Sequence, residues 1–165
     1  MPKAVYAGSF DPITNGHLDI VGRASAIFDH VVVAVLQNPS KDTSLFTASE
    51  RVDMIREALN DTAGRVSVDK FSGLLVDYCD RIGATVVVRG LRAVSDFEYE
   101  FQMAMMNRHL NNRVETFFMS ASASYFYTAS RLVKEVASLG GDVSTLVPTV
   151  VQRRLSEKYS KTRKP

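Results

Sequence analysis

The sequence has a single cysteine, Cys79, among its 165 residues, and it has no long apolar run. One cysteine excludes an intramolecular disulfide and a cysteine cluster for a metal. No apolar run approaches the roughly 18 residues that a membrane-spanning helix needs. The first twelve residues reach a charged turn too early to contain the apolar region of a signal peptide. We therefore expect a cytoplasmic protein without a membrane partner.

The net positive charge of the chain is confined to its C-terminal end. The net charge is +2, but six Lys and Arg residues stand against one acid between Gln152 and Pro165, which leaves 14 basic and 17 acidic residues in the body. Zinc-finger spacings and a basic stripe across the body are absent. We expect no nucleic-acid partner and interpret the basic tail, from about residue 160, as a solvated end. A nucleic-acid-binding domain is an alternative that rests on this tail alone, and deletion of Lys161–Pro165 would test it.

Strand-like and helix-like segments alternate along the chain without a long linker or an internal repeat. The predicted strands are Ala4–Gly8, His30–Leu36, Arg65–Lys70, Ala84–Val88 and Thr116–Met119. The predicted helices are Gly16–Phe28, one that opens at Thr47 with a capping box to Glu50, Leu74–Ile82, Asp96–Leu110, Ser130–Leu139 and one after Pro148. This order predicts a single α/β domain over residues 1–165, with a doubly wound five-stranded parallel sheet and helices on both faces.

Ligands of such sheets bind beyond the carboxyl ends of the strands. In this sequence the segments after the strands supply hydroxyls, amides, lysine and arginine: Ser9, Asn38, Ser40, Lys41, Ser72, Arg89, Arg92, and the hydroxyls between Ser120 and Ser130. A catalytic carboxylate pair and a nucleophile elbow are both missing. The pattern favours a site that holds anionic oxygen, such as phosphate.

The first of these loops carries the most information. Gly8 lets the backbone approach a ligand closely, and Gly16-His17 lies at a predicted helix N-terminus, where free amides favour an anion. The spacing fits neither a Walker loop nor the dinucleotide G-x-G-x-x-G. A lone histidine at a helix start is most often a residue that bonds backbone, but this one shares an edge with Ser9, Lys41 and Arg92, which favours a functional role.

The segment Gly8-Ser9-Phe10-Asp11-Pro12-x-x-x-Gly16-His17 resembles the signature of the nucleotidylyltransferase superfamily in its T-x-G-H form. Four further segments narrow the resemblance: Asn38–Lys41 (NPSK), Arg89–Arg92 (RGLR), Asp96–Glu100 (DFEYE) and Met106–His109 (MNRH). With these five motifs in order, the chain is similar to the bacterial phosphopantetheine adenylyltransferase family from about Lys3 to Tyr159.

The resemblance implies a Rossmann-like fold, a homohexamer, and Mg²⁺ carried by the nucleotide. It also implies reversible transfer of the adenylyl group of ATP to 4′-phosphopantetheine, which gives dephospho-coenzyme A and pyrophosphate in coenzyme A biosynthesis. We assign His17 and Lys41 to the transition-state oxygens, and Ser9 to orienting a phosphate. No residues are expected to form a metal site of the protein's own.

The other site residues are carried over by position. ATP would contact Ser9, Phe10, His17, Gly90, Leu91, Arg92, Glu100, Tyr125, Phe126, Tyr127, Thr128, Ala129, Ser130 and Arg131. Phosphopantetheine would contact Ser9, Lys41, Leu75, Arg89 and Asn107. The sequence departs from the family at Ala129 and Arg131, where serines are usual, so one hydroxyl is lost and one cation gained.

Two alternatives stay open at this point. One is another member of the superfamily, such as a nicotinate mononucleotide adenylyltransferase or a cytidylyltransferase. Thr14 disfavours it, because those enzymes usually carry histidine two positions before the glycine. The other is a nucleotide-binding regulatory module without catalysis, which would not require both His17 and Lys41.

Overall fold

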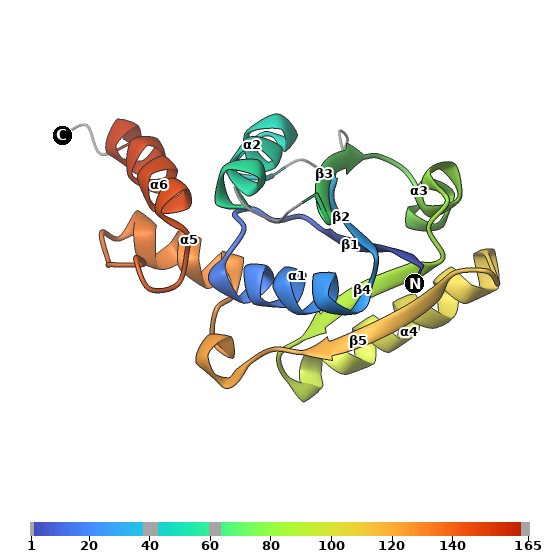
Figure 1. Cartoon of the computed structure of the whole chain (residues 1–165). Coiled ribbons are helices and arrows are strands. Elements are labelled where there is room, and N and C mark those ends of the chain that lie inside the picture. The colour runs from blue at the N-terminus through green and yellow to red at the C-terminus, as the bar shows by residue number, and fades with distance from the viewer. Residues whose placement is uncertain (1, 38–42, 60–63, 163–165) are drawn as a thin grey trace.

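Five parallel strands form one sheet in the order β3-β2-β1-β4-β5 (Figure 1). The strands are β1 (Lys3–Gly8), β2 (His30–Leu36), β3 (Val66–Phe71), β4 (Val86–Leu91) and β5 (Glu115–Ser120). This computed structural model describes residues 2–37, 43–59 and 64–162, with residues 94, 95, 161 and 162 described by their backbone alone. The order places β1 at the centre. The chain runs outward from β1 to β3 and then returns to add β4 and β5 on the other side of β1.

The helices connect the strands and cover the sheet. They are α1 (Asn15–Ile27), α2 (Ala48–Ala58), α3 (Leu75–Ile82), α4 (Val94–Leu110), α5 (Ser130–Ser138) and α6 (Thr149–Thr162), with a short 3₁₀ turn over Ala123–Tyr125. In Figure 1, α4 runs along β4 and β5, and α6 lies between α5 and α2. Four helices, α1, α2, α5 and α6, contribute to one hydrophobic cluster, whereas α3 contributes to a second.

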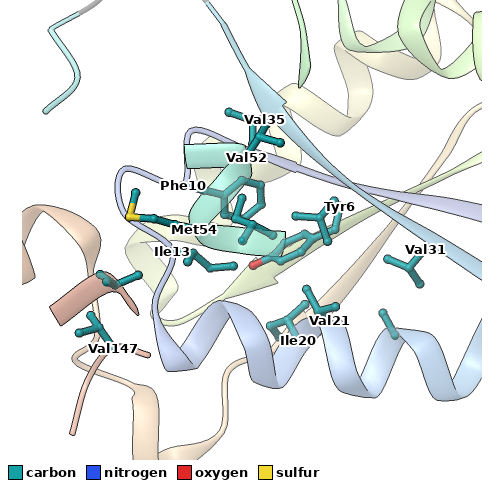
Figure 2. Packing of buried hydrophobic residues seen from close by; sticks show 14 of the residues in the cluster. Tyr6, Phe10, Ile13, Ile20, Val21, Val31, Val35, Val52, Met54 and Val147 are labelled. Carbon is teal, nitrogen blue, oxygen red and sulfur yellow. The ribbon is translucent and has the colours of Figure 1, made fainter. Parts of the chain in front are cut away.

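The two clusters lie on opposite faces of the sheet, because neighbouring residues of β1 alternate between them. Tyr6 belongs to the first cluster, and Val5 and Ala7 belong to the second. Figure 2 shows Ile20 and Val21 of α1 beneath Tyr6, with Phe10 beside it. Burial on both faces explains the near-continuous valine of β2, as expected for a parallel strand.

The predicted fold class is confirmed, and most predicted elements lie within two residues of the observed ones. The capping box is confirmed as well, because Thr47 Oγ1 accepts from the Glu50 amide (3.2 Å) and Glu50 accepts from the Thr47 amide (2.8 Å). Gly83 ends α3 in the left-handed region at φ 67°, a conformation that favours glycine.

The prediction for the fourth strand is wrong in its bounds. The strand extends to Leu91 and pairs Arg89, Gly90 and Leu91 with β5, so these residues lie in the sheet and not in a loop after it. An arginine and a glycine lack the β-branched signal used to predict the strand's end. Backbone pairing with β5 extends β4 through Arg89, Gly90 and Leu91.

Candidate active site

A cavity of about 710 Å³ opens at the carboxyl ends of β1 and β4. This is the switch point of the sheet, where open α/β folds bind their ligands, and the volume is in the range of small-molecule sites. Four segments line it: the loop after β1 with the start of α1, residues 43 and 44 before α2, the end of β4 with the start of α4, and residues 121–134. The cavity therefore brings together segments far apart in the sequence.

The loop after β1 contributes residues 8–11 to the lining of this cavity. Phe10 has φ 47°, an uncommon conformation for a non-glycine residue, and its ring is buried beside Tyr6 with 5.3 Å between ring centroids. A side chain at Gly8 would approach that ring to 3.1 Å, so the glycine makes room for Phe10. The aromatic packing holds the backbone of the loop in place.

The buried side chain of Arg51, on α2, anchors the same loop. This side chain is 1% exposed and donates to the carbonyl oxygens of Ser9 (2.7 Å), Leu36 (3.1 Å) and Phe46 (3.0 Å). An arginine has five N–H donors in a fixed plane, so one buried side chain can bind several carbonyls at once. Arg51 thereby ties the loop after β1 to the end of β2 and to the entry of α2.

His17 lies in the first turn of α1, with its ring 5.2 Å from the Phe10 ring and in the cavity wall. The Thr14 backbone N–H donates to His17 Nδ1 at 3.0 Å. An atom that accepts this hydrogen bond carries no proton, so a neutral His17 has its proton on Nε2. Burial, then Arg92 and Arg89, lower the pKa of His17 to about 4. At neutral pH the ring is an uncharged N–H donor.

Arg89 and Glu100 form a bidentate pair across the β4 side of the cavity. Arg89 Nε lies 2.6 Å from Glu100 Oε2, Nη2 bonds the other carboxylate oxygen, and Nη1 donates to the carbonyl of Ala7. Burial alone would lower the pKa of Arg89, but the Glu100 carboxylate raises it above the ordinary value. Three of the five N–H groups of Arg89 are bonded in this way, so two are left for a phosphate oxygen.

Arg92 and the N-terminus of α5 complete the cationic wall. Arg92 pairs with Asp96 at 3.1 Å and is 41% exposed at its side chain, so it can reach a ligand. Thr128, Ala129, Ser130 and Arg131 also line the cavity, where the free amides at the start of α5 favour an anion. The lining thus combines Arg89 and Arg92, each paired with a carboxylate, with Arg131 and the amides at the start of α5.

Most residues predicted for the site do meet in this cavity. Those that line it are Ser9, Phe10, His17, Arg89, Gly90, Arg92, Glu100, Tyr125, Thr128, Ala129, Ser130 and Arg131. Leu75, Leu91, Asn107, Phe126 and Tyr127 do not line it. Lys41 lies outside the described residues, as do Asn38 and Ser40.

Sequence reasoning missed several residues that line the cavity, among them Tyr6, Asp11, Thr14 and Lys134. Thr14 could have been found, because it is the first position of the T-x-G-H pattern. Asp11 and Lys134 are 123 residues apart in the sequence, and only the folded chain shows that they form an ion pair. Burial of Tyr6 raises the pKa of its phenol above the ordinary value, so the hydroxyl keeps its proton.

Comparison with known proteins decides the family. A sequence model of the family described as Cytidylyltransferase-like matches residues 5–136. The phosphopantetheine adenylyltransferase of Heliobacterium modesticaldum is 57% identical over 162 residues, 98% of this chain and 95% of the relative. The enzyme of the same name from Geobacter metallireducens is 55% identical over 165 residues, 99% of this chain and 100% of the relative.

The chain belongs to the phosphopantetheine adenylyltransferase family. It is therefore a nucleotidyltransferase, and the recognition made from the five sequence motifs is confirmed. The crystal structure of a candidate nicotinate-nucleotide adenylyltransferase from Vibrio parahaemolyticus has a TM-score of 0.68, with 18% identity and coverage of 94% of this chain and 99% of that one. At that identity the likeness shows a shared fold only.

The C-terminal basic residues are partly accounted for by the fold. Arg153 pairs with Glu57 at 3.0 Å and Lys158 with Glu50 at 3.0 Å, while Leu155 is buried against the core. The positive charge of α6 thus faces acids of α2 in this family member.

Within the described part of the chain, no helix is long and apolar enough to cross a membrane. The same residues contain no group of three or more His, Cys, Asp or Glu that could hold a metal ion.

Proposed function

We propose that this chain transfers the adenylyl group of ATP to 4′-phosphopantetheine, giving dephospho-coenzyme A and pyrophosphate. Identity above 50% to relatives of that name supports the reaction. Its chemistry is supported by one observation above all: His17 presents an uncharged Nε2–H donor in a cavity lined by arginines and the α5 N-terminus. Such a site stabilises phosphate charge without removing a proton.

The reaction requires no general base. A phosphate oxygen of phosphopantetheine forms a bond to the α-phosphorus of ATP while the bond from that phosphorus to the bridging oxygen of pyrophosphate breaks. The nucleophile is already an anion, so catalysis consists of alignment and charge stabilisation. In the proposal His17 Nε2 donates to an oxygen on the α-phosphate, Ser9 orients a phosphate, and Lys41 serves the same transition state.

The nucleotide and acceptor would occupy different parts of the site. Arg92, Gly90, Leu91, Glu100 and the stretch from Tyr125 to Arg131 would hold ATP. Arg89 would bind the acceptor phosphate together with Ser9 and Lys41. Leu75 and Asn107 lie outside the cavity wall, on α3 and α4, and would contact the pantetheine arm that extends beyond it. Magnesium enters this proposal as part of the substrate, because phosphate oxygens are its preferred ligands.

We further propose that the chain is one domain that assembles as a homohexamer in the cytoplasm. The support for assembly comes from α4, whose large apolar side chains are half or more exposed at Met105, Met106 and Leu110. Several large apolar side chains exposed on one helix are typical of interaction surfaces. A second copy of the chain would cover this helix.

Pyrophosphate release in the presence of magnesium and ATP tests the proposed reaction. The acceptors compared are 4′-phosphopantetheine, nicotinate mononucleotide and none. Release with phosphopantetheine alone is expected. Release with nicotinate mononucleotide instead would contradict the acceptor assignment, and an absence of release with every acceptor would contradict the reaction.

A further inference from the structure

The buried carboxylate of Asp11 joins three segments of the chain. Asp11 is 6% exposed, and its two oxygens accept from the backbone amides of Leu45 and Phe46 at 2.9 Å each. The ammonium group of Lys134, on α5, lies 2.6 Å from Asp11 Oδ2. A buried carboxylate with three donors is fixed in position, because each lone pair directed at a donor resists rotation.

A second bond from α5 reaches the same loop. Ser130 Oγ donates to the carbonyl of Pro12 at 2.7 Å, and Ser130 and Lys134 are four residues apart, so they lie on one side of the helix. The first turn of α5 is therefore fastened at two points to the loop that follows β1. The two segments fastened together both line the cavity: one contributes Ser9, Phe10 and His17, and the other contributes Thr128 to Arg131.

We propose that Asp11 and Lys134 are a positioning pair that sets the separation of these two parts of the lining, and with it the alignment of the nucleotide phosphates. The inference rests on the proposed adenylyl transfer. Neither residue is assigned to the reacting atoms: Asp11 acts through Ser9 and Phe10 of its own loop, and Lys134 acts through the N-terminus of α5. Misplacement of reacting groups by about 1 Å can lower a rate by about a hundredfold, so this separation bears on turnover.

The test combines Lys134→Met, Lys134→Arg, Asp11→Asn and the double variant Asp11→Asn/Lys134→Met. Each is measured for kcat, for KM of ATP and for urea unfolding, at a temperature where the protein is folded. The matched control is Glu57→Gln/Arg153→Met, which removes an exposed ion pair between α2 and α6. The control is expected to leave kcat unchanged.

We expect Lys134→Met to lower kcat by about tenfold or more, with a smaller change in KM of ATP. Lys134→Arg keeps the charge beside Asp11 and should recover part of the loss. The double variant has no unpaired buried charge, but the NH₂ group of Asp11→Asn faces one of the two backbone amides. We therefore expect only part of the stability lost in Lys134→Met to return, while kcat stays low.

Three results would overturn the positioning role. The first is a wild-type kcat in folded Lys134→Met. The second is recovery of kcat together with stability in the double variant, which would mark the pair as structural only. The third is a rise in KM of ATP without a fall in kcat, which would make Lys134 a direct nucleotide contact. Failure of the proposed function is distinguishable, because wild-type protein would then show no phosphopantetheine-dependent turnover at all.

Discussion

His17 Nδ1 accepts a hydrogen bond from the backbone amide of Thr14 at 3.0 Å, and the Thr14 hydroxyl accepts from the His17 amide at 3.4 Å. The two residues form a reciprocal capping box at the start of α1. The histidine thereby caps its own helix while its Nε2 remains available for a ligand. One local motif fixes both the tautomer of the ring and the direction of its donor.

The loss of kcat on substitution of His17 should depend on which ring nitrogen the new side chain replaces. His17→Gln can place an amide N–H near the position of Nε2, whereas His17→Asn reaches only the position of Nδ1. We expect His17→Ala and His17→Asn to lower kcat by roughly 10²–10³, with little change in ATP affinity, and His17→Gln to lose less. Steady-state kinetics and nucleotide titration check this. Equal losses in all three variants would show that the Nε2 donor is not what the reaction uses.

The low pKa of His17 predicts how stability and activity vary with pH. Its pKa is about 4 in the folded chain and about 6.5 in an unfolded one, so between these values the unfolded state binds the proton more tightly. Stability therefore rises with pH from about 4 to 6.5, by at most about 1.4 kcal/mol per pH unit from this residue. His17 is neutral above about pH 5, so its titration should leave kcat flat from there to pH 8.

Urea unfolding of the wild type and of His17→Gln at several pH values between 4.5 and 7 measures this contribution. The variant has no group to titrate at position 17, so its stability should change less over that interval. Parallel pH profiles for the two proteins would contradict the shifted pKa.

The pair between Arg89 and Glu100 predicts a selective effect on the acceptor. Glu100→Gln removes the charge and leaves a single carbonyl oxygen where the carboxylate offered two. Because Glu100 orients Arg89 in the structure, we expect KM for phosphopantetheine to rise about tenfold, with a smaller change for ATP. Separate titration of the two substrates checks this. A rise confined to ATP would contradict the orienting role of Glu100 on Arg89 and leave only its proposed contact with the nucleotide.

The exposed side of α4 predicts an assembly that one charge can weaken. Met105 is 54% exposed, so Met105→Asp should not disturb the core of one protomer but would place a carboxylate in an apolar contact between copies. We expect the wild type to sediment as a hexamer and the variant as a smaller species. Leu139→Asp, at an 81% exposed position directly after α5, is the matched control. A monomeric wild type at micromolar concentration would contradict the hexamer.

The sequence predicts those features that depend on local pattern. The capping box at Thr47, the left-handed end of α3 at Gly83 and the valine-rich β2 follow from propensity and periodicity, and each is observed. The end of β4 was mispredicted because Arg89 and Gly90 owe their strand conformation to pairing with β5, which is not local.

The anchoring of the site could not be predicted from the sequence for the same reason. In the sequence Arg51 is an ordinary polar residue of a predicted helix. In the structure it is buried and donates to the carbonyl of Ser9, 42 residues earlier in the chain. The pair between Asp11 and Lys134 likewise exists only in the folded state. The residues proposed to contact the phosphates are identified by sequence motifs, whereas the residues that hold them in place are identified only by tertiary contacts.

The most direct measurement is the exchange of labelled pyrophosphate into ATP, with magnesium, in the presence and absence of 4′-phosphopantetheine. Direct transfer between two aligned substrates predicts exchange only when the acceptor is present, because the enzyme itself forms no bond to the adenylyl group. Exchange without acceptor would reveal a covalent adenylyl-enzyme and contradict the role given to His17. A lack of exchange in both conditions would contradict adenylyl transfer to phosphopantetheine.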